Sequence, residues 1–131
     1  MTLGIAALAV VGCNSGTSTE GTTGATGGGN TTRLAPGDQT PDPNKIKIGL
    51  VASINGALKP WGIDSQDGAL LAEKEINDAG GINGKMVQLL IEDSNSQPEQ
   101  GKTAAERLIA KGCVALIGEV ASGITAQIAN A

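Results

Sequence analysis

Three short runs rich in branched apolar residues constrain the fold of this chain more than any other feature. They span residues 46–52, 85–93 and 113–118. The first, IKIGLVA, is almost wholly apolar, as is typical of strands that are buried on both faces of a parallel sheet. A stretch with helical spacing follows each run. The βαβαβα order over residues 45–131 therefore predicts an α/β fold, a parallel sheet with helices on both faces.

The helices between these strands have recognisable ends. Asp64 or Ser65 is expected to cap the first helix, which leaves residues 53–62 as a loop. The apolar stripe expected for this helix consists of Gly68 or Ala69, Ala72, Ile76 and Ala79. Pro98 begins the second helix and Gly112 ends it. Its expected stripe consists of Gly101, Ala104 or Ala105, and Leu108. A third helix is expected to begin at Ser122.

The glycine-rich stretch AGGINGK, residues 79–85, has the composition of a phosphate-binding loop but the wrong context. Such a loop follows a strand, precedes a helix and carries Ser or Thr after its Lys. Here a helix comes before and a strand after, and Met86 follows Lys85. The stretch is predicted to be a turn, with Gly80 in the left-handed conformation that ends many helices.

The N-terminal third differs from the rest of the chain. Residues 3–12 are uninterrupted apolar or small, too short a run to span a bilayer but typical of a secretory signal. VVGC, ending at Cys13, resembles the lipobox of bacterial lipoproteins, so residues 1–12 are predicted to be a signal peptide and Cys13 its lipidated residue. A buried strand with an incidental Cys is the alternative. No Lys or Arg precedes the run, so the true start is expected upstream.

Residues 13–44 are predicted to be the lipidated Cys and a flexible tether. Gly, Thr, Ser, Asn and Pro dominate this segment, and such sequence has too little apolar surface to fold. A tether of this kind after a lipidated Cys would hold a folded domain off the membrane.

Composition excludes several classes of function. The net charge is −4 and no basic run occurs, so nucleic-acid binding is not expected. The chain has no His, the commonest general base and metal ligand, and we expect neither a metal, a cofactor nor enzymatic activity. Glu92 and Asp93 are expected to be solvated, and Cys113 to be buried and unreactive.

The globular part resembles a known family. IKIGLVAS, INDAGGINGK and MVQLLIEDS follow one another at the spacing seen in type I periplasmic substrate-binding proteins of the leucine/isoleucine/valine-binding branch. A helix with P-E-Q near its start and an IG-x-x-x-S turn complete the resemblance, which covers residues 45–131. It implies a protein that captures a branched-chain or related amino acid outside the cytoplasm and delivers it to the permease of an ABC transporter. Its place would be the periplasm or the outer face of the cell membrane.

The resemblance also implies a ligand-binding edge. Ligands of open parallel sheets bind beyond the carboxyl ends of the strands. Family members use a Ser at the position of Ser122 to hold the ligand's α-carboxylate, and often an aromatic residue at that of Trp61. Asn55 is a weaker candidate. The alternatives are a helix cap for Ser122, a hydrophobic plug for Trp61 and a turn residue for Asn55.

The family has two lobes, and residues 45–131 correspond to the first part of lobe 1 only. The chain is therefore expected to be an N-terminal fragment that lacks the second lobe and the group that holds the ligand's ammonium. Other possibilities are a ligand-sensing domain of the same fold, or a protein that binds urea, amides or aromatic acids. A small flavodoxin-like enzyme is a further alternative.

Overall fold

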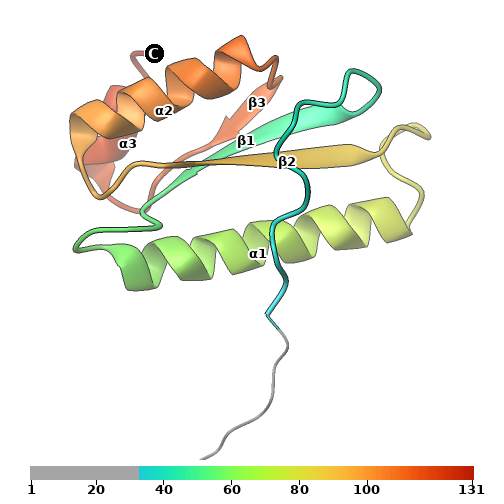
Figure 1. Cartoon of the computed structure of the whole chain (residues 1–131), viewed down its shortest axis with the longest axis horizontal. Coiled ribbons are helices and arrows are strands. Elements are labelled where there is room, and N and C mark those ends of the chain that lie inside the picture. Colours follow the sequence, from blue (N-terminus) through green and yellow to red (C-terminus); the bar gives the residue numbers. More distant parts are fainter. Residues whose placement is uncertain (1–32) are drawn as a thin grey trace, which may run out of the picture. The chain divides into compact units, whose positions relative to one another are not determined.

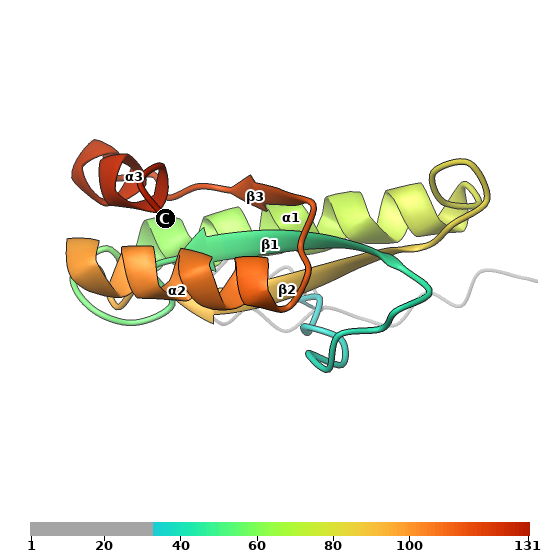
Figure 2. The same cartoon turned by 90° about the horizontal axis from the view of Figure 1, so that it is seen from above.

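The computed structural model describes residues 33–131, which form a three-stranded parallel sheet between two layers of helices (Figure 1). The strands are β1 (Ile46–Ala52), β2 (Val87–Asp93) and β3 (Ala115–Ile117), in the order β2-β1-β3. The helices are α1 (Lys59–Asp78), α2 (Pro98–Ala110) and α3 (Ser122–Ile128). Helix α1 covers one face, while α2 and α3 cover the other (Figures 1 and 2). The predicted α/β fold is confirmed.

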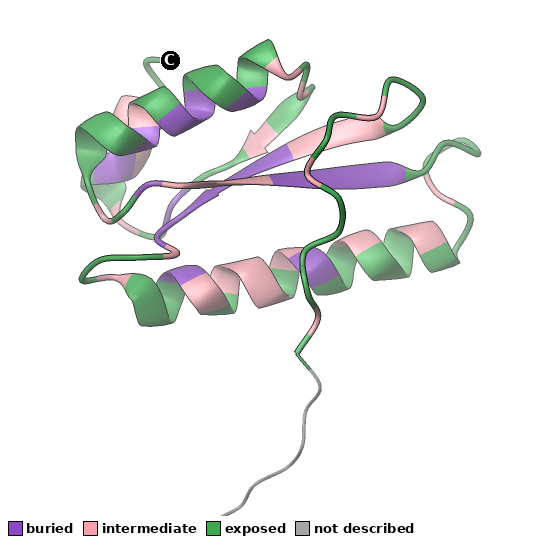
Figure 3. Ribbon diagram, in the orientation of Figure 1, coloured by how far each residue is buried: buried purple, intermediate pink, exposed green. Residues whose placement is uncertain are grey.

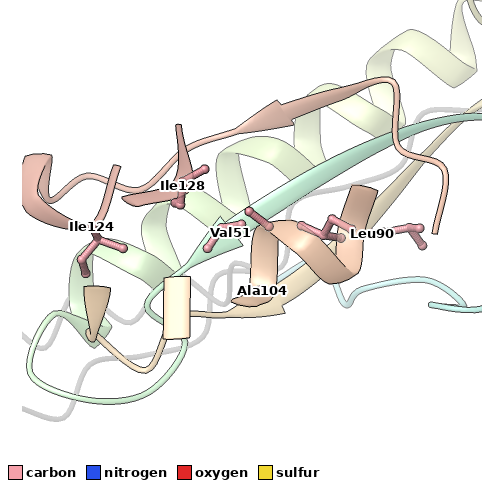
Figure 4. Packing of buried hydrophobic residues seen from close by; sticks show 7 residues of the cluster. Val51, Leu90, Ala104, Ile124 and Ile128 are labelled. Atoms are coloured by element: carbon pink, nitrogen blue, oxygen red, sulfur yellow. The ribbon is translucent and has the colours of Figure 1, made fainter. Parts of the chain in front are cut away.

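Side chains that alternate along the central strand divide the core into two halves. Val51 points to α2 and α3 and is fully buried with Leu90 and Leu108 (Figure 4). Leu50 and Ala52 point to the other face, where they pack with Leu70 of α1. With no Phe or Tyr in the chain, small aliphatic side chains fill both halves, and they allow close packing of helix on sheet. The stripe predicted for α2 is confirmed, since Gly101, Ala104, Ala105 and Leu108 are its buried residues.

The turn from α1 into β2 is the structural turn that the sequence predicts. Gly80 has a φ of +96° and Gly81 a φ of +77°. The Gly81 N–H donates to the Ile76 carbonyl at 2.8 Å, and the Gly80 N–H to the Asn77 carbonyl at 3.0 Å. These two bonds form a Schellman motif, which satisfies carbonyls that the end of a helix leaves free. Both positions need glycine because of their left-handed backbone.

Helix α1 begins earlier than its sequence predicts. It starts at Lys59 rather than near Asp64, with Pro60 in its first turn and no side-chain cap. Proline is pre-organised for this position because its φ is already helical and it lacks the N–H that would be left unpaired there. The loop after β1 therefore ends at Leu58, and Trp61 belongs to the first turn of α1.

The buried face of α1 also differs from the prediction. Most of α1 is exposed or only partly buried (Figure 3). Only Gly62 and Leu70 are buried in this helix, whereas Ala72 and Ile76 are exposed. The predicted stripe does face the sheet: Ala69, Ala72 and Ile76 line one side of a narrow groove, opposite Ile117 of β3 and residues of the other strands. It stays exposed because nothing in residues 33–131 covers the groove beside β3.

The strands β2 and β3 are shorter than the apolar runs that predict them. Strand β2 begins at Val87 rather than Lys85, because Lys85 still belongs to the turn and pairs with Ile82. Strand β3 covers three of the six residues predicted, although the Val114 N–H still donates to the Lys47 carbonyl.

Residues 33–44, which we call the strap, cross β2 and α1 before the chain enters β1 (Figure 1). The Gln39 amide donates to the Leu89 carbonyl at 3.3 Å and accepts from the Ile91 N–H at 2.7 Å. Gln88 returns hydrogen bonds to the carbonyls of Asp38 and Thr40. The flexible tether predicted up to residue 44 therefore does not describe these residues, because amide side chains bind them to the sheet.

The outer edge of β2 is hydrogen-bonded by side chains of α1 as well as by the strap. The Asn77 amide accepts from the Val87 N–H at 2.7 Å and donates to the Val87 carbonyl at 2.9 Å. The Leu89 N–H donates to the Glu73 carboxylate at 2.9 Å. These contacts satisfy backbone groups that an edge strand otherwise leaves open to pairing with another chain.

Two glycines of α1 give a matched test of this packing. A Cβ atom at position 62 would lie 2.0 Å from the Ser53 carbonyl oxygen, which is backbone and cannot move aside cheaply. We expect Gly62→Ala to lower the free energy of unfolding by about 1–3 kcal/mol or more. Gly68 has no atom within 4 Å of its Cβ position, so Gly68→Ala should instead raise stability by up to ~1 kcal/mol. Urea denaturation of both variants measures the difference, and equal effects would contradict the close approach of α1 to β1.

Candidate functional site

The carboxyl ends of all three strands meet around one buried carboxylate, that of Glu119. Its Oε2 accepts the Ser53 hydroxyl at 2.8 Å and the Ser94 hydroxyl at 2.7 Å. Ser53 follows β1, Ser94 follows β2, and Glu119 lies in the loop after β3. Ser53 and Ser94 are 0% exposed and Glu119 is 8% exposed. Three separate loops are thus joined at a single oxygen atom.

A second acid, Asp93, organises the loop between β1 and α1. Its Oδ1 accepts the N–H groups of Ile54 at 2.9 Å and Asn95 at 2.7 Å, and the Asn55 amide donates to Oδ2 at 2.7 Å. Burial opposes the ionisation of Asp93. The hydrogen bonds from the Asn55 side chain and from backbone N–H groups outweigh it, so the pKa of Asp93 lies below the ordinary value of a carboxyl group. The expectation that Asp93 is simply solvated is therefore wrong.

The loop after β2 also holds the loop after β1. The Ser96 hydroxyl donates to the Asn55 carbonyl and accepts from the Leu58 N–H, both at 3.0 Å. Gly56 has a φ of +87°, and a Cβ atom there would lie 2.6 Å from the Asn95 carbonyl oxygen. Only glycine fits this contact, which brings the two loops together.

The ligand-binding candidates predicted from sequence lie at this same edge, on the loop or helix that follows a strand. Trp61 is 57% exposed in the first turn of α1, and its neighbour Gly62 packs against the Ser53 backbone. Ser122 is exposed at the first position of α3. Ala121 precedes it at the cap position, so the alternative role of Ser122 as the helix cap is wrong. Asn55 is exposed, but its amide is engaged by Asp93. Cys13 lies outside the described residues.

Sequence reasoning missed Ser53, Ser94 and Glu119. A signal was available, because each is a polar residue within two positions of the carboxyl end of a strand. Parallel strands bring such positions to one edge of the sheet. Burial could not be read from the sequence, and Ser and Glu are residue types that are mostly exposed.

Glu92, the neighbour of Asp93, is not solvated either. Its carboxylate accepts from Arg107 Nε at 3.0 Å and from Lys111 Nζ at 2.6 Å, both on or just after α2. These ion pairs attach the end of α2 to β2. They leave no free acidic pair for a metal, and residues 33–131 contain no cluster of three or more metal-ligating side chains.

Cys113 is half-buried rather than fully buried, and it packs against the core beside α2 and α3. Burial raises the pKa of its thiol, although the ammonium groups of Lys47 and Lys111 act in the opposite direction. A raised pKa leaves little thiolate at neutral pH, in agreement with the unreactive Cys that the sequence predicts.

An open hollow of about 500 Å³ lies away from this edge, between the strap and α1. Arg33, Leu34, Asp67 and Leu71 line it, and Arg33 forms an ion pair with Asp67 across it. Arg33 pairs with Asp67 Oδ2 and leaves Asp67 Oδ1 buried without a hydrogen-bond partner in the described part of the chain. We place the candidate site at the carboxyl edge of the sheet instead, where the loops after all three strands meet. None of the described helices is long and apolar enough to cross a membrane.

Comparison with known proteins agrees with this geometry. The family model described as periplasmic binding protein matches residues 45–131, which include the whole sheet and all three helices. The chain belongs to the periplasmic binding protein family. It is similar to Leu/Ile/Val-binding protein homolog 1 of Brucella abortus, with 39% identity over 80 residues, which cover 61% of this chain and 22% of that protein.

Two further relatives carry related names. The leucine-, isoleucine-, valine-, threonine- and alanine-binding protein of Pseudomonas aeruginosa is 34% identical over 80 residues, 61% of this chain and 21% of its own length. Among solved structures, the substrate-binding protein LivJ of Streptococcus pneumoniae, in complex with isoleucine, has a TM-score of 0.63 and 35% identity. The match covers 64% of this chain and 24% of LivJ. This periplasmic binding protein chain therefore spans about a quarter or less of the length of its relatives.

The lowered pKa of Asp93 predicts an acid-sensitive loop. A carboxyl whose folded pKa lies below its unfolded value stabilises the fold above about pH 4, and this contribution is lost as the pH falls further. We expect wild-type protein to lose stability between about pH 5 and 3 more steeply than Asp93→Asn. Asn55→Ala, which removes one donor to Asp93, should show an intermediate slope. Denaturant midpoints across this pH range measure the effect, and parallel curves for wild type and Asp93→Asn would contradict it.

Proposed function

We propose that this chain is the first part of lobe 1 of an extracytoplasmic solute-binding lipoprotein that captures a branched-chain or related amino acid and delivers it to an ABC-transporter permease. The observation that carries the proposal is the 39% identity over 80 residues to a protein named Leu/Ile/Val-binding. The likeness to LivJ, whose structure contains isoleucine, supports the same ligand class. For the full-length protein, we also propose a second lobe, a hinge and a cleft that closes on the ligand.

Ser122 and Trp61 are the residues to which we assign ligand contact. Both are exposed and stand at the carboxyl edge of the sheet. A hydroxyl at Ser122 can donate to the α-carboxylate of an amino acid, and the indole of Trp61 can cover an aliphatic side chain. Asn55 has the weaker claim, because Asp93 already engages its amide. Its contribution to binding is to hold the loop that precedes Trp61.

The proposal assigns binding rather than catalysis to this edge. A serine beside a carboxylate is one element of a nucleophilic site, and Ser53 and Ser94 both have this neighbour. Both side chains are fully buried, however, so a substrate has no access to either hydroxyl. The exposed groups at the edge suit recognition of a small polar molecule.

A thermal-shift screen of the full-length protein that contains this chain tests the ligand class. We expect leucine, isoleucine or valine to raise the midpoint of unfolding, since a ligand that binds only the folded state stabilises it. Ser122→Ala should then weaken binding about 10–100-fold, the cost of one hydrogen bond to a charged group, as measured by calorimetric titration.

Thr103→Ala, which removes a hydroxyl from the exposed side of α2, is the matched control and should bind as wild type does. Trp61→Ala in the same titration tests whether the indole covers the aliphatic side chain of the ligand. If urea, amides or aromatic acids raise the unfolding midpoint and no aliphatic amino acid does, the proposed ligand class is wrong. Absence of any shift would count against solute binding itself.

Fractionation of the bacterial host tests the lipid anchor. We expect the wild-type protein to stay with the membrane and Cys13→Ser to be released from it, because the thiol of Cys13 is the proposed attachment point of the lipid. Cys113→Ser removes the other cysteine of the chain and should leave the protein at the membrane. Membrane retention of Cys13→Ser would contradict the lipoprotein proposal.

A further inference from the structure

The side-chain hydrogen bonds of the loop that carries Ser122 are those of Glu119, while Ala121 of the same loop packs against the apolar core. The carboxylate Oε2 accepts from Ser53 and Ser94, while Oε1 accepts from the Val120 N–H at 3.1 Å. The backbone carbonyl of Glu119 accepts from the Thr125 hydroxyl at 2.6 Å. One residue thus contacts the ends of β1 and β2, its own loop and α3.

This arrangement is costly if its purpose is stability alone. A carboxylate that leaves water loses hydration, and hydrogen bonds from protein groups recover only part of it. Apolar side chains of similar volume at positions 53, 94 and 119 would close the same space without that loss. A buried polar network instead restricts the structure to the geometry in which every donor meets its acceptor.

The donors and acceptors of the Ser53, Ser94 and Glu119 cluster allow few other arrangements of these side chains. Each serine hydroxyl has a single hydrogen that the carboxylate can accept, and the two hydroxyl oxygens lie 3.0 Å apart, where one can instead donate to the other. The Ser94 oxygen in turn accepts from the Ser96 N–H at 3.3 Å. A shift of the loop after β3 would leave at least one of the two buried hydroxyls without an acceptor, which is unfavourable.

We propose that Glu119 is a positioning residue of the ligand-binding edge: it fixes the loop after β3 against the ends of β1 and β2 and thereby sets where Ser122 meets the ligand. The inference rests on the proposed function, because it assumes that Ser122 contacts the ligand. Glu119 itself does not touch the ligand, since it is buried beneath the loop with its oxygens occupied by protein donors.

Two substitutions of Glu119 distinguish the effect of its hydrogen bonds on the position of the loop from the effect of its negative charge. Glu119→Gln keeps the length of the side chain, and its amide can donate to or accept from a serine hydroxyl, which can do both. Glu119→Ala removes every side-chain contact. In the full-length protein we expect Glu119→Ala to weaken binding of the best amino-acid ligand at least about tenfold, and Glu119→Gln to stay within about threefold of wild type.

A double-mutant cycle with Ser122→Ala distinguishes positioning from a general loss of stability. If Glu119 acts through Ser122, the double variant Glu119→Ala/Ser122→Ala binds about as weakly as the weaker single variant. If the cluster only stabilises the fold, Glu119→Ala lowers the unfolding temperature but leaves the Kd, measured well below that temperature, at its wild-type value. That result would overturn the inference, as would equal losses for Glu119→Gln and Glu119→Ala.

Milder variants serve if Glu119→Ala does not fold. Ser53→Ala and Ser94→Ala each remove one donor to Glu119, and each should weaken binding less than Ser122→Ala and non-additively with it. Additive losses would contradict the inference.

Failure of the proposed function gives a different result. If wild-type protein binds none of the ligands, the role of Glu119 in holding the loop can still be tested by amide hydrogen exchange of residues 120–125. Faster exchange in Glu119→Ala than in Glu119→Gln supports positioning of the loop, and equal rates overturn it.

Discussion

Strand β1 is hydrogen-bonded on both sides, and the position of every other element follows from it. All seven of its residues pair with β2, and three of them also pair with β3. Gly49 at its centre leaves room for Leu108 and Leu116, whose side-chain atoms lie 2.9 Å and 2.6 Å from where a Cβ atom would be. The last four residues of β1 are buried, and the first residue after it, Ser53, is also fully buried. The loop of the candidate site that follows β1 therefore begins at a buried, closely packed residue.

The two edges of the sheet are treated differently. Side chains of Asn77, Glu73 and Gln39 occupy backbone groups along the outer edge of β2. Strand β3 has no such contacts within residues 33–131, and the apolar residues of α1 beside it remain exposed. A further parallel strand would thus find an open partner only in β3, and a covering element there would bury the stripe that the sequence predicts for α1. This difference between the two edges explains why the predicted stripe of α1 faces the sheet, as expected, but is not buried.

The sequence predicted those features that depend on local chemistry. The bounds of β1, the Schellman turn with Gly80 and the buried face of α2 follow from apolar patterns, positive-φ glycines and a proline at a helix start. The predicted start of α1 was wrong because the prediction relied on a polar cap at Asp64 or Ser65, whereas the helix begins with Pro60 in its first turn and has no side-chain cap. The Glu119 cluster was missed for another reason. Its members are far apart in sequence and meet only through the parallel order of the strands, and none of them belongs to a residue type that is usually buried.

Asp93 and Glu119 lie at the same edge of the sheet and accept hydrogen bonds from different groups. Asp93 binds backbone N–H groups of the loops after β1 and β2, whereas Glu119 binds hydroxyls beneath them. Both acids are engaged with the protein, so neither is available to an incoming solute. In the function that we propose, recognition falls to the exposed groups on the first turns of α1 and α3, and the two acids connect the loops that precede them. If Trp61 and Ser122 contact the ligand as we propose, substitutions there would change the ligand while the buried residues, and with them the fold, remain the same.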